Sequence, residues 1–370
     1  MYEFASTVFL GGLATRSNYT KDNVVVRFAI RIFLAFVAIG ILVLASCSDK
    51  QRPVVHLQGQ TMGTTYNVKY LLAENEQEAI DAEKLQQQID ARLVEVNKMM
   101  STYDPTSELS RFNQYRYTDN FAVSPDTLFV VNEALRLAKL SGGVLDVTVG
   151  PLVNLWGFGP TKRPEKVPTE SDINEVRDYV GYNKLTTTPT GLKKSHPMLY
   201  VDLSTIAKGF GVDEVAEILE QQGIQDYLVE IGGEMRVRGE RGDGNEWLIA
   251  IEKPVTTERT VQKVVSIGEN AVATSGDYRN YYEENGVRYS HLIDPTTGSP
   301  ISHNLVSVTV IHPSSMTADG LATAFNVMGW EQAIAVAEQE KLMVFLIRRT
   351  ADGFDEYASP EFDKLVTVHN

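Results

Sequence analysis

The chain has 370 residues, of which 43% are hydrophobic and 22% charged, so it is long enough to bury a sizeable core and is typical of a globular protein rather than a disordered one. Its formal net charge of −14 makes nucleic acid a poor partner. The sequence contains one Cys, which excludes an intramolecular disulfide and leaves an oxidising compartment possible.

The N-terminal stretch has the layout of a secretory signal. Arg27 and Arg31 precede an uncharged run over residues 32–46, which is shorter than the roughly 20 residues needed to cross a bilayer core. The run ends in Leu-Ala-Ser before Cys47, which resembles a bacterial lipobox, in which the Cys is lipidated and becomes the first residue. An uncleaved signal anchor is the alternative. We therefore expect a signal peptide over residues 1–46, with a misassigned start as one explanation for residues 1–25, and a lipid-anchored protein of the cell envelope facing the periplasm or exterior, with the choice of inner or outer membrane open.

A tether over residues 47–58 is predicted to lead into one folded domain over residues 59–370. Residues 61–70 are rich in strand-forming side chains around one Gly. Apolar residues three or four apart then predict a helix with one buried face, at Leu85, Ile89, Leu93, Val96 and Met100. A second helix begins at Ser124-Pro125-Asp126, a cap followed by a good first residue and a dipole-favoured acid, and is closed by Gly142 and Gly143.

The second half of the chain alternates strands and helices without a regular order. After a Pro-rich and charged loop over residues 160–168 and a short helix over 171–180, we predict a strand at 198–201, a turn at 202–205 and a helix at 206–222 that ends at Gly223. Further strands are predicted at 227–231, 247–251, 264–267, 307–311 and 343–347, and further helices at 316–326 and 330–340. This mixed order favours an α+β fold over a doubly wound one.

Several common chemical motifs are excluded. Gly209-Phe-Gly211 would need a third Gly at position 214, which is Glu214, and the pair lies inside a helical pattern, so a dinucleotide-binding fingerprint is rejected. Scattered His residues and one Cys give no zinc constellation, and neither a P-loop nor a nucleophile elbow is present.

An oxygen-rich set of side chains remains, and oxygen ligands suit a hard cation such as Mg²⁺. Asp319 and Thr323 are four residues apart in a predicted helix, so they point the same way and could share one ion. The alternative is that Thr317 caps the helix and Asp319 favours its N-terminal dipole. Asp202, Thr205 and Asp294 complete the set.

Other candidates are each open to a plain structural interpretation. Glycine pairs at 142–143 and 232–233 let the backbone approach a ligand, but they are also ordinary turns. Tyr103 could stack on a flat ring or simply pack beside a Pro turn. His291 and Asp294 suit a proton acceptor and its support, or a satisfied loop His and an Asp-Pro turn.

Taken together, these segments resemble the ApbE family of FAD:protein FMN transferases, once described as thiamine-biosynthesis lipoproteins. The resemblance is nearly full length and depends on the order of its motifs, which include Thr-Met-Gly-Thr-Thr-Tyr, Asp-Leu-Ser-Thr-Ile-Ala-Lys-Gly and Met-Thr-Ala-Asp-Gly-Leu-Ala-Thr-Ala; the matching segments cover residues 59–66, 100–113, 142–159, 202–209, 230–233, 274–278, 291–298 and 316–324. It implies an ApbE-like α+β fold of mixed sheets and packed helices, with a flavin site in a cleft between two closely packed lobes.

The resemblance also implies a reaction and a site. The reaction is Mg²⁺-dependent cleavage of FAD, with FMN attached by a phosphoester to Ser or Thr of an acceptor protein and AMP released. Metal ligands are expected at Asp319, Thr323 and Thr205, the last through its carbonyl. His291 is our candidate for receiving the hydroxyl proton, because an imidazole has an unperturbed pKa near neutrality, and Asp294 is the candidate for its support. The implied FAD contacts are Met62, Tyr103, Val144, Leu145, Asp146, Asp202, Lys208 and Ile293.

The expected acceptors are envelope proteins with a short acidic and Gly-containing Ser/Thr motif, such as subunits of membrane NADH:quinone reductases. Two alternatives stay open. The first is an Mg²⁺-dependent FAD pyrophosphatase, because the same metal and anhydride serve attack by water. The second is a non-catalytic flavin-binding lipoprotein.

Overall fold

The computed structural model describes residues 28, 31, 52–72, 80–159, 167–255, 260–276, 281–284 and 286–369. Cys47 and nearly all of the predicted signal lie outside this range, and no helix of the described residues is long and apolar enough to cross a membrane. Residues 51–370 form one compact unit. Its first strand begins at Val54, so residues 54–58 of the segment predicted as a tether belong to the folded domain, where they pair with the following strand.

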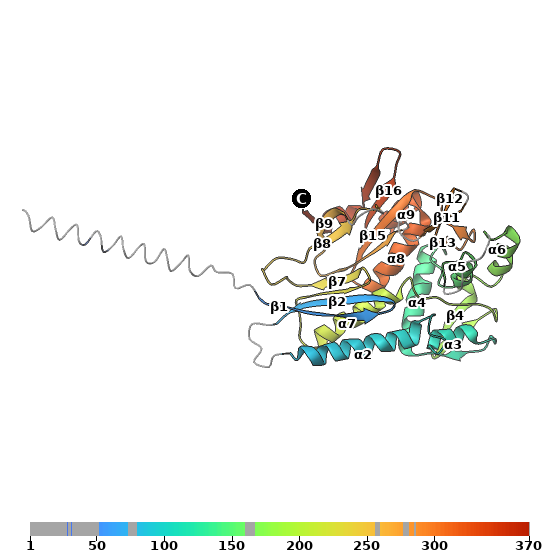
Figure 1. The fold of residues 1–370 in the computed structure, drawn as a ribbon, viewed down its shortest axis with the longest axis horizontal. Coiled ribbons are helices and arrows are strands. Elements are labelled where there is room, and N and C mark those ends of the chain that lie inside the picture. Colours follow the sequence, from blue (N-terminus) through green and yellow to red (C-terminus); the bar gives the residue numbers. More distant parts are fainter. Residues whose placement is uncertain are drawn as a thin grey trace, which may run out of the picture. The chain divides into compact units, whose positions relative to one another are not determined.

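An antiparallel sheet of eight strands forms the frame, in the order β1-β2-β6-β7-β10-β15-β16-β17 (Figure 1). Two of its hairpins turn in two residues at Met62-Gly63 and Gly232-Gly233, with positive φ at all four positions. The strands of this sheet are β1 (Val54–Thr61), β2 (Thr64–Leu71), β6 (Tyr227–Ile231), β7 (Glu234–Arg238), β10 (Ala271–Gly276), β15 (Leu305–His312), β16 (Met343–Arg349) and β17 (Phe354–Ala358).

Smaller sheets surround this frame. One three-stranded sheet has the order β18-β9-β8 and another β3-β5-β4, and two isolated hairpins are formed by β11-β12 and β13-β14. Their bounds are β3 (Phe121–Ala122), β4 (Leu185–Thr188), β5 (Gly191–Lys194), β8 (Ile249–Glu252), β9 (Val261–Ser266), β11 (Tyr281–Glu284), β12 (Val287–Ser290), β13 (Ile293–Asp294), β14 (Ser299–Pro300) and β18 (Thr367–His369).

The helices mostly begin at side-chain caps that satisfy their first N–H groups. Asp81, Ser107, Ser124, Thr169, Ser314 and Ser359 cap α2, α3, α4, α6, α8 and α10 in that order. The bounds are α2 (Ala82–Met100), α3 (Glu108–Gln114), α4 (Pro125–Leu140), α5 (Gly150–Leu155), α6 (Glu170–Arg177), α7 (Ala207–Gln221), α8 (Ser315–Met328), α9 (Trp330–Gln339) and α10 (Pro360–Leu365), with a 3-10 turn at Tyr182–Lys184.

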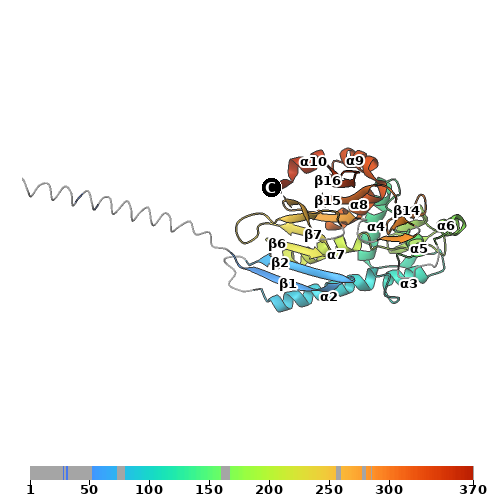
Figure 2. The same cartoon turned by 45° about the horizontal axis from the view of Figure 1, so that its top comes forward.

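Both faces of the large sheet are buried, which explains the near-continuous apolar run of β16. Val344 and Leu346 join the core formed with α4, α7 and α8, whereas Phe345 and Ile347 point to the opposite core, beneath the β18-β9-β8 sheet and α10. A third cluster fills the space between α2, α7 and the β1, β2 and β6 strands, which lie together in Figure 2. The expected α+β class is confirmed.

One local prediction was wrong, and one alternative interpretation does not hold. Residues 198–201 form no strand, because side chains rather than a neighbouring strand satisfy their backbone: the amide of Asn113 exchanges hydrogen bonds of 2.7 and 2.8 Å with Val201. Thr317 is not the cap of its helix. Ser314 accepts from the Thr317 N–H at 3.3 Å, and the Thr317 hydroxyl donates to Glu133 at 2.7 Å.

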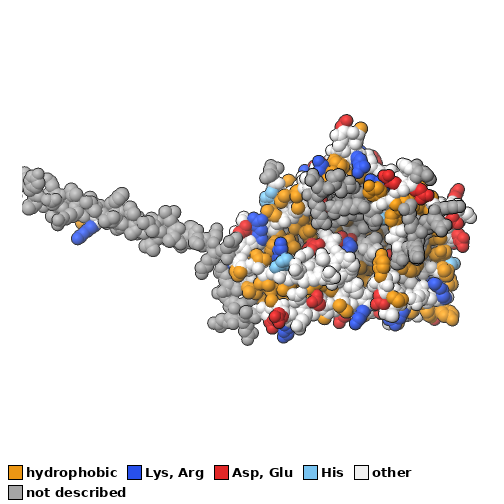
Figure 3. Space-filling model, viewed as in Figure 1, with side chains coloured by type: hydrophobic (Ala, Val, Ile, Leu, Met, Phe, Trp, Pro, Cys, Tyr) orange, Lys and Arg blue, Asp and Glu red, His pale blue; other side chains and the backbone are white. Residues whose placement is uncertain are grey.

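Acidic and basic side chains are interspersed over much of the face shown in Figure 3. The described part of this face carries no large area of a single charge sign, although the chain has a net charge of −14.

Candidate active site

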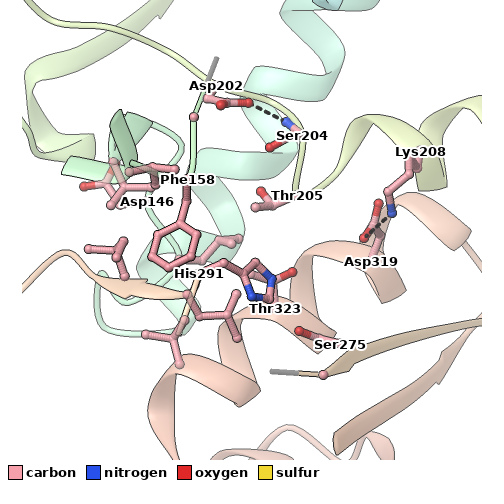
Figure 4. A pocket seen from close by; sticks show the side chains of 18 of the residues that line it. Asp146, Phe158, Asp202, Ser204, Thr205, Lys208, Ser275, His291, Asp319 and Thr323 are labelled. Carbon is pink, nitrogen blue, oxygen red and sulfur yellow. Dashed lines mark hydrogen bonds and ion pairs between the residues drawn. The ribbon is translucent and has the colours of Figure 1, made fainter. Parts of the chain in front are cut away.

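A pocket of about 430 Å³ lies where α7 and α8 begin, beside the turn from β6 to β7 and the segment after β12. Figure 4 shows Lys208 and Asp319 facing each other in this pocket, with Phe158 beside His291 further along its wall. Eleven of the residues implied by the resemblance line it: Tyr103, Val144, Leu145, Asp146, Asp202, Thr205, Lys208, His291, Ile293, Asp319 and Thr323.

Met62 lines an adjoining hollow of about 770 Å³, which shares Tyr103, Asp202 and Lys208 with the first pocket. The two hollows therefore adjoin each other at these shared residues. Met62 has a φ of 49°, a left-handed conformation that costs a non-glycine residue roughly 1–2 kcal/mol. The two-residue turn imposes this conformation and holds the Met side chain at the hollow.

Asp319 is held in place because α7 and α8 cap each other, each with a carboxylate that accepts hydrogen bonds from N–H groups at the start of the other helix. The first turn of α7 has no side-chain cap of its own, and Asp319 Oδ2 accepts a hydrogen bond of 3.0 Å from the Gly209 N–H. In return, Asp213 on α7 accepts from the N–H groups of Ser315 and Met316, each at 3.0 Å. Each helix therefore satisfies N–H groups at the start of the other, which fixes Asp319 relative to both.

This mutual capping requires a Gly where the two helices meet. A Cβ on Gly209 would lie 2.3 Å from the Ser315 carbonyl oxygen and 2.7 Å from the Met316 Cα. Both are backbone atoms, so a side chain at this position would force the helices apart. The Gly-x-Gly pattern of the sequence thus serves helix packing rather than nucleotide phosphate binding.

Three charged side chains meet in the pocket wall. Lys208 Nζ lies 2.7 Å from Glu234 Oε1 and 3.8 Å from Asp319 Oδ1. Burial raises the pKa of Asp319 to about 7, against the opposing effect of Lys208, and burial also raises the pKa of Glu234. Two carboxylates share one ammonium, so the fully ionised cluster carries one uncompensated negative charge that a cation would neutralise.

The donor atoms around Asp319 fit a hard cation. The Thr205 Oγ1 is buried and has no hydrogen-bond partner in the described part of the chain, and Thr323 follows Asp319 by one helical turn. No group of three His, Cys, Asp or Glu side chains able to hold a metal occurs among the described residues. A metal site here would therefore combine one carboxylate with Thr oxygens, main-chain carbonyls and oxygens of the ligand.

The pocket wall formed by residues 144–148 is held in place by hydrogen bonds. The Asp146 carboxylate accepts bonds from the Thr148 N–H at 2.8 Å, the Thr148 hydroxyl at 2.7 Å and the Tyr182 N–H at 2.8 Å. Burial nevertheless raises the pKa of Asp146. The Asp202 N–H donates to the Val147 carbonyl at 2.7 Å, which joins this wall to the turn before α7. The Asp146 side chain thus serves mainly to shape the pocket.

Lys194 supports the same turn from the interior. Its buried ammonium donates to the carbonyls of Phe112 and Leu199 at 3.1 and 3.2 Å and lies 4.8 Å from the centre of the Phe112 ring. With the Asn113 amide on Val201, these contacts fix the extended segment that delivers Asp202 to the pocket.

His291 lines the pocket at the base of the β11-β12 hairpin, next to a column of aromatic rings. Its ring lies 6.4 Å from that of Phe158, in an edge-on arrangement. Phe158 stacks on Tyr282 at 5.2 Å, Tyr282 on Tyr289 at 5.1 Å, and Tyr289 on Trp156 at 5.5 Å. The column joins the hairpin to the loop after α5 and so holds His291 against the pocket.

The catalytic role predicted for Asp294 does not fit this geometry. Its Oδ1 accepts from the Thr296 N–H at 2.8 Å and from the Thr296 hydroxyl at 2.6 Å, and its carbonyl accepts from the Gly298 N–H at 2.8 Å. Asp294 does not line the pocket. It closes the turn between β13 and β14, which was the plainer interpretation of the Asp-Pro sequence.

Glu234 is the charged residue of the pocket wall that sequence reasoning missed. It is 5% exposed, and its Oε2 is buried without a hydrogen-bond partner in the described part of the chain. The available signal was an acid directly after the Gly232-Gly233 turn, a place where the backbone approaches a ligand closely. Ser204, Ser275 and Phe158 also line the pocket and were not singled out.

Comparisons with known proteins identify the family. Residues 62–346 match the family model described as the ApbE family. The chain is 57% identical over 324 residues to the FAD:protein FMN transferase of Vibrio cholerae (87% of this chain, 96% of the relative) and 52% identical over 330 residues to that of Haemophilus influenzae (88% and 94%).

Solved structures give the same result for the fold. The flavin transferase ApbE from Vibrio cholerae superposes with a TM-score of 0.79 at 55% identity, covering 85% of this chain and 99% of the other. The apo form of the flavinyl transferase ApbE of Pseudomonas stutzeri gives 0.78 at 39% identity, with 85% and 97% covered.

Proposed function

The chain belongs to the ApbE family and is an enzyme that transfers FMN from FAD to protein, and from this premise we propose how its own residues carry out the reaction. The cluster of Lys208, Glu234 and Asp319 carries the proposal, because a buried pair of carboxylates with one ammonium suits a dication next to a pyrophosphate.

We propose Asp319, Thr323 and the main-chain carbonyl of Thr205 as Mg²⁺ ligands. The fit rests on the buried carboxylate, the unpartnered Thr205 hydroxyl that marks an unfilled polar space, and the Thr323 hydroxyl one turn further along α8. The chemistry that bound Mg²⁺ supplies is neutralisation of the charge that builds up on the pyrophosphate oxygens of FAD.

The other pocket residues bind and orient FAD. Lys208 offers a cation to the pyrophosphate, and Tyr103 offers a flat face, 73% exposed, at the boundary of the two hollows. Met62, the wall at Val144, Leu145 and Asp146, the turn at Asp202, and Ile293 enclose the remainder of the dinucleotide.

The transfer step is an in-line displacement. A Ser or Thr hydroxyl oxygen of the acceptor attacks the FMN-side phosphorus, the new P–O bond forms as the anhydride P–O bond breaks, and AMP leaves. His291 receives the hydroxyl proton, since an imidazole ordinarily titrates near neutrality and this one faces the pocket beside Thr323.

A direct test mixes the purified protein with FAD, Mg²⁺ and the extracytoplasmic domain of a membrane NADH:quinone reductase subunit. We expect one FMN-sized mass gain on the acceptor for each AMP released. AMP and free FMN in the absence of labelled acceptor would identify a pyrophosphatase and contradict the proposed transfer to this acceptor class.

The location is also a proposal. The Leu-Ala-Ser-Cys sequence at residues 44–47 supports a lipid anchor on Cys47 and an enzyme that faces the periplasm or exterior. We expect Cys47→Ala to abolish labelling by a fatty-acid probe and to release the protein from the membrane fraction. Continued lipid labelling of that variant would contradict the anchor.

A further inference from the structure

A third hollow, of about 330 Å³, has a lining that no step of the proposed reaction uses. Two guanidinium groups, an imidazole, two hydroxyls and an amide gather there, and none of the lining residues that the structure describes carries a carboxylate, in a chain with a net charge of −14. The polar lining residues are Arg288, Ser290, Ser302, His303, Asn304 and Arg349.

The positive charge of this hollow depends largely on Arg349, as its neighbour in β16 shows. Arg348 points elsewhere: it donates to Asp355 at 2.9 Å and lies 4.4 Å from the centre of the Trp330 ring. Arg349 is exposed and has no ion pair within the described residues. Its main chain is fixed at the hollow by two bonds with Asn304, of 2.8 and 3.0 Å. The guanidinium is therefore anchored at its base and available to an anion.

His303 is a second lining residue that could make further hydrogen bonds. Both of its ring nitrogens are buried, and neither has a hydrogen-bond partner in the part of the chain that the structure describes. The ring is confined on one side by Gly329, where a Cβ would lie 3.0 Å from the His303 Cδ2. Leaving such a group without a partner is costly, and an anion in the hollow would offer it one.

The hollow and the reaction pocket lie on two sides of one chain segment. Ser290 lines the hollow and His291 lines the pocket, and the Ile301 N–H of the hollow donates to the carbonyl of Leu292 at 3.0 Å. Neighbouring residues of this segment therefore line the two cavities, and an extended chain advances about 3.3 Å per residue, so we expect a short acceptor segment to reach both.

We propose that this hollow binds an acidic side chain of the acceptor protein, a few residues from the hydroxyl that takes up FMN. The inference rests on the proposed function, because it assumes a protein acceptor at the pocket. An exposed guanidinium matches a carboxylate in charge and in its paired donors. The enzyme's net charge repels acidic proteins in general, so a local basic hollow would select where such an acceptor engages.

The test compares Arg349→Ala with Arg348→Ala, which removes the same charge from the adjacent position of the same strand. With the same reductase domain as acceptor, we expect Arg349→Ala to lower kcat/KM for the acceptor about tenfold and Arg348→Ala to change it less than twofold. KM for FAD should stay unchanged in both. Arg349→Lys should recover part of the loss.

A second arm identifies the group that is bound. Each Asp and Glu of the acceptor within about six residues of the flavinylated Ser or Thr is replaced in turn by its amide. We expect one replacement to cost the wild-type enzyme about tenfold in kcat/KM and to cost Arg349→Ala nothing further. Equal kcat/KM for the Arg349 and Arg348 variants would overturn the proposal. The proposal would also be overturned if inorganic phosphate competed with FAD in the wild type but not in Arg349→Ala, because the hollow would then bind a phosphate. Absence of labelling by the wild-type enzyme, with FAD still bound, would instead refute the proposed function.

Discussion

Replacing Gly209 by Ala probes the contact between α7 and α8 that holds Asp319. The new Cβ would meet the Ser315 carbonyl oxygen at 2.3 Å, whereas ordinary contacts begin near 3.4 Å, so α8 has to move by about 1 Å. Overpacking of this kind costs about 1–3 kcal/mol, and helix propensity returns at most about 1 kcal/mol. We therefore expect the free energy of unfolding to fall by about 1–2 kcal/mol.

The same shift should disturb the proposed Mg²⁺ site, because the hydrogen bond between Gly209 and Asp319 spans the interface that is forced open. Urea denaturation gives the stability, and electron paramagnetic resonance of Mn²⁺ gives the affinity of the site. Gly211→Ala is the matched control in the same helix: its new Cβ would meet the flexible end of Met62 at 2.9 Å and Ile231 at 3.4 Å. The reasoning is refuted if both variants have equal stability and equal Mn²⁺ affinity.

Three further changes have defined outcomes. Asp213→Asn leaves the start of α8 less well satisfied, and we expect a loss of about 2 kcal/mol in urea denaturation; an unchanged value would show that the mutual capping of the helices contributes nothing. Glu234→Gln removes one of the two carboxylates beside Lys208 and should weaken Mn²⁺ binding about tenfold by calorimetry, whereas unchanged affinity would separate Glu234 from the metal site. Burial lowers the pKa of Lys194 to about 8, so between about pH 8 and 10.5 the unfolded chain binds more protons than the folded one and the wild type gains up to about 3 kcal/mol on raising the pH. The free energy of unfolding of Lys194→Met should lack this rise. The same dependence on pH in both proteins would contradict the lowered pKa of Lys194.

Local patterns were sufficient for elements that depend on local chemistry. The spacing of Leu85 to Met100 predicted α2 because apolar side chains three or four apart bury one helix face, and Ser124 predicted the start of α4 because its hydroxyl caps that helix. Residues 198–201 were misassigned because their partners, Asn113 and Lys194, are side chains that local strand propensity does not register.

The site residues also fall into two groups, those that the sequence predicted and those that depend on long-range contacts. The order of motifs brought Asp319, Thr323 and His291 to attention, and the structure places them in one pocket. The bond from Gly209 to Asp319 joins residues 110 positions apart, so no local pattern reveals it. Glu234 was missed for the same reason, since its burial beside Lys208 arises only when β7 meets α7.

The account depends most on Asp319, and one comparison tests it directly. Wild type and Asp319→Asn are incubated with FAD, Mg²⁺ and the acceptor domain, while AMP release, the mass of the acceptor and FAD binding are measured together. We predict equal amounts of AMP and flavinylated acceptor from the wild type, and neither from Asp319→Asn, which still binds FAD. Labelling of the acceptor by Asp319→Asn at the wild-type rate would contradict the central claim.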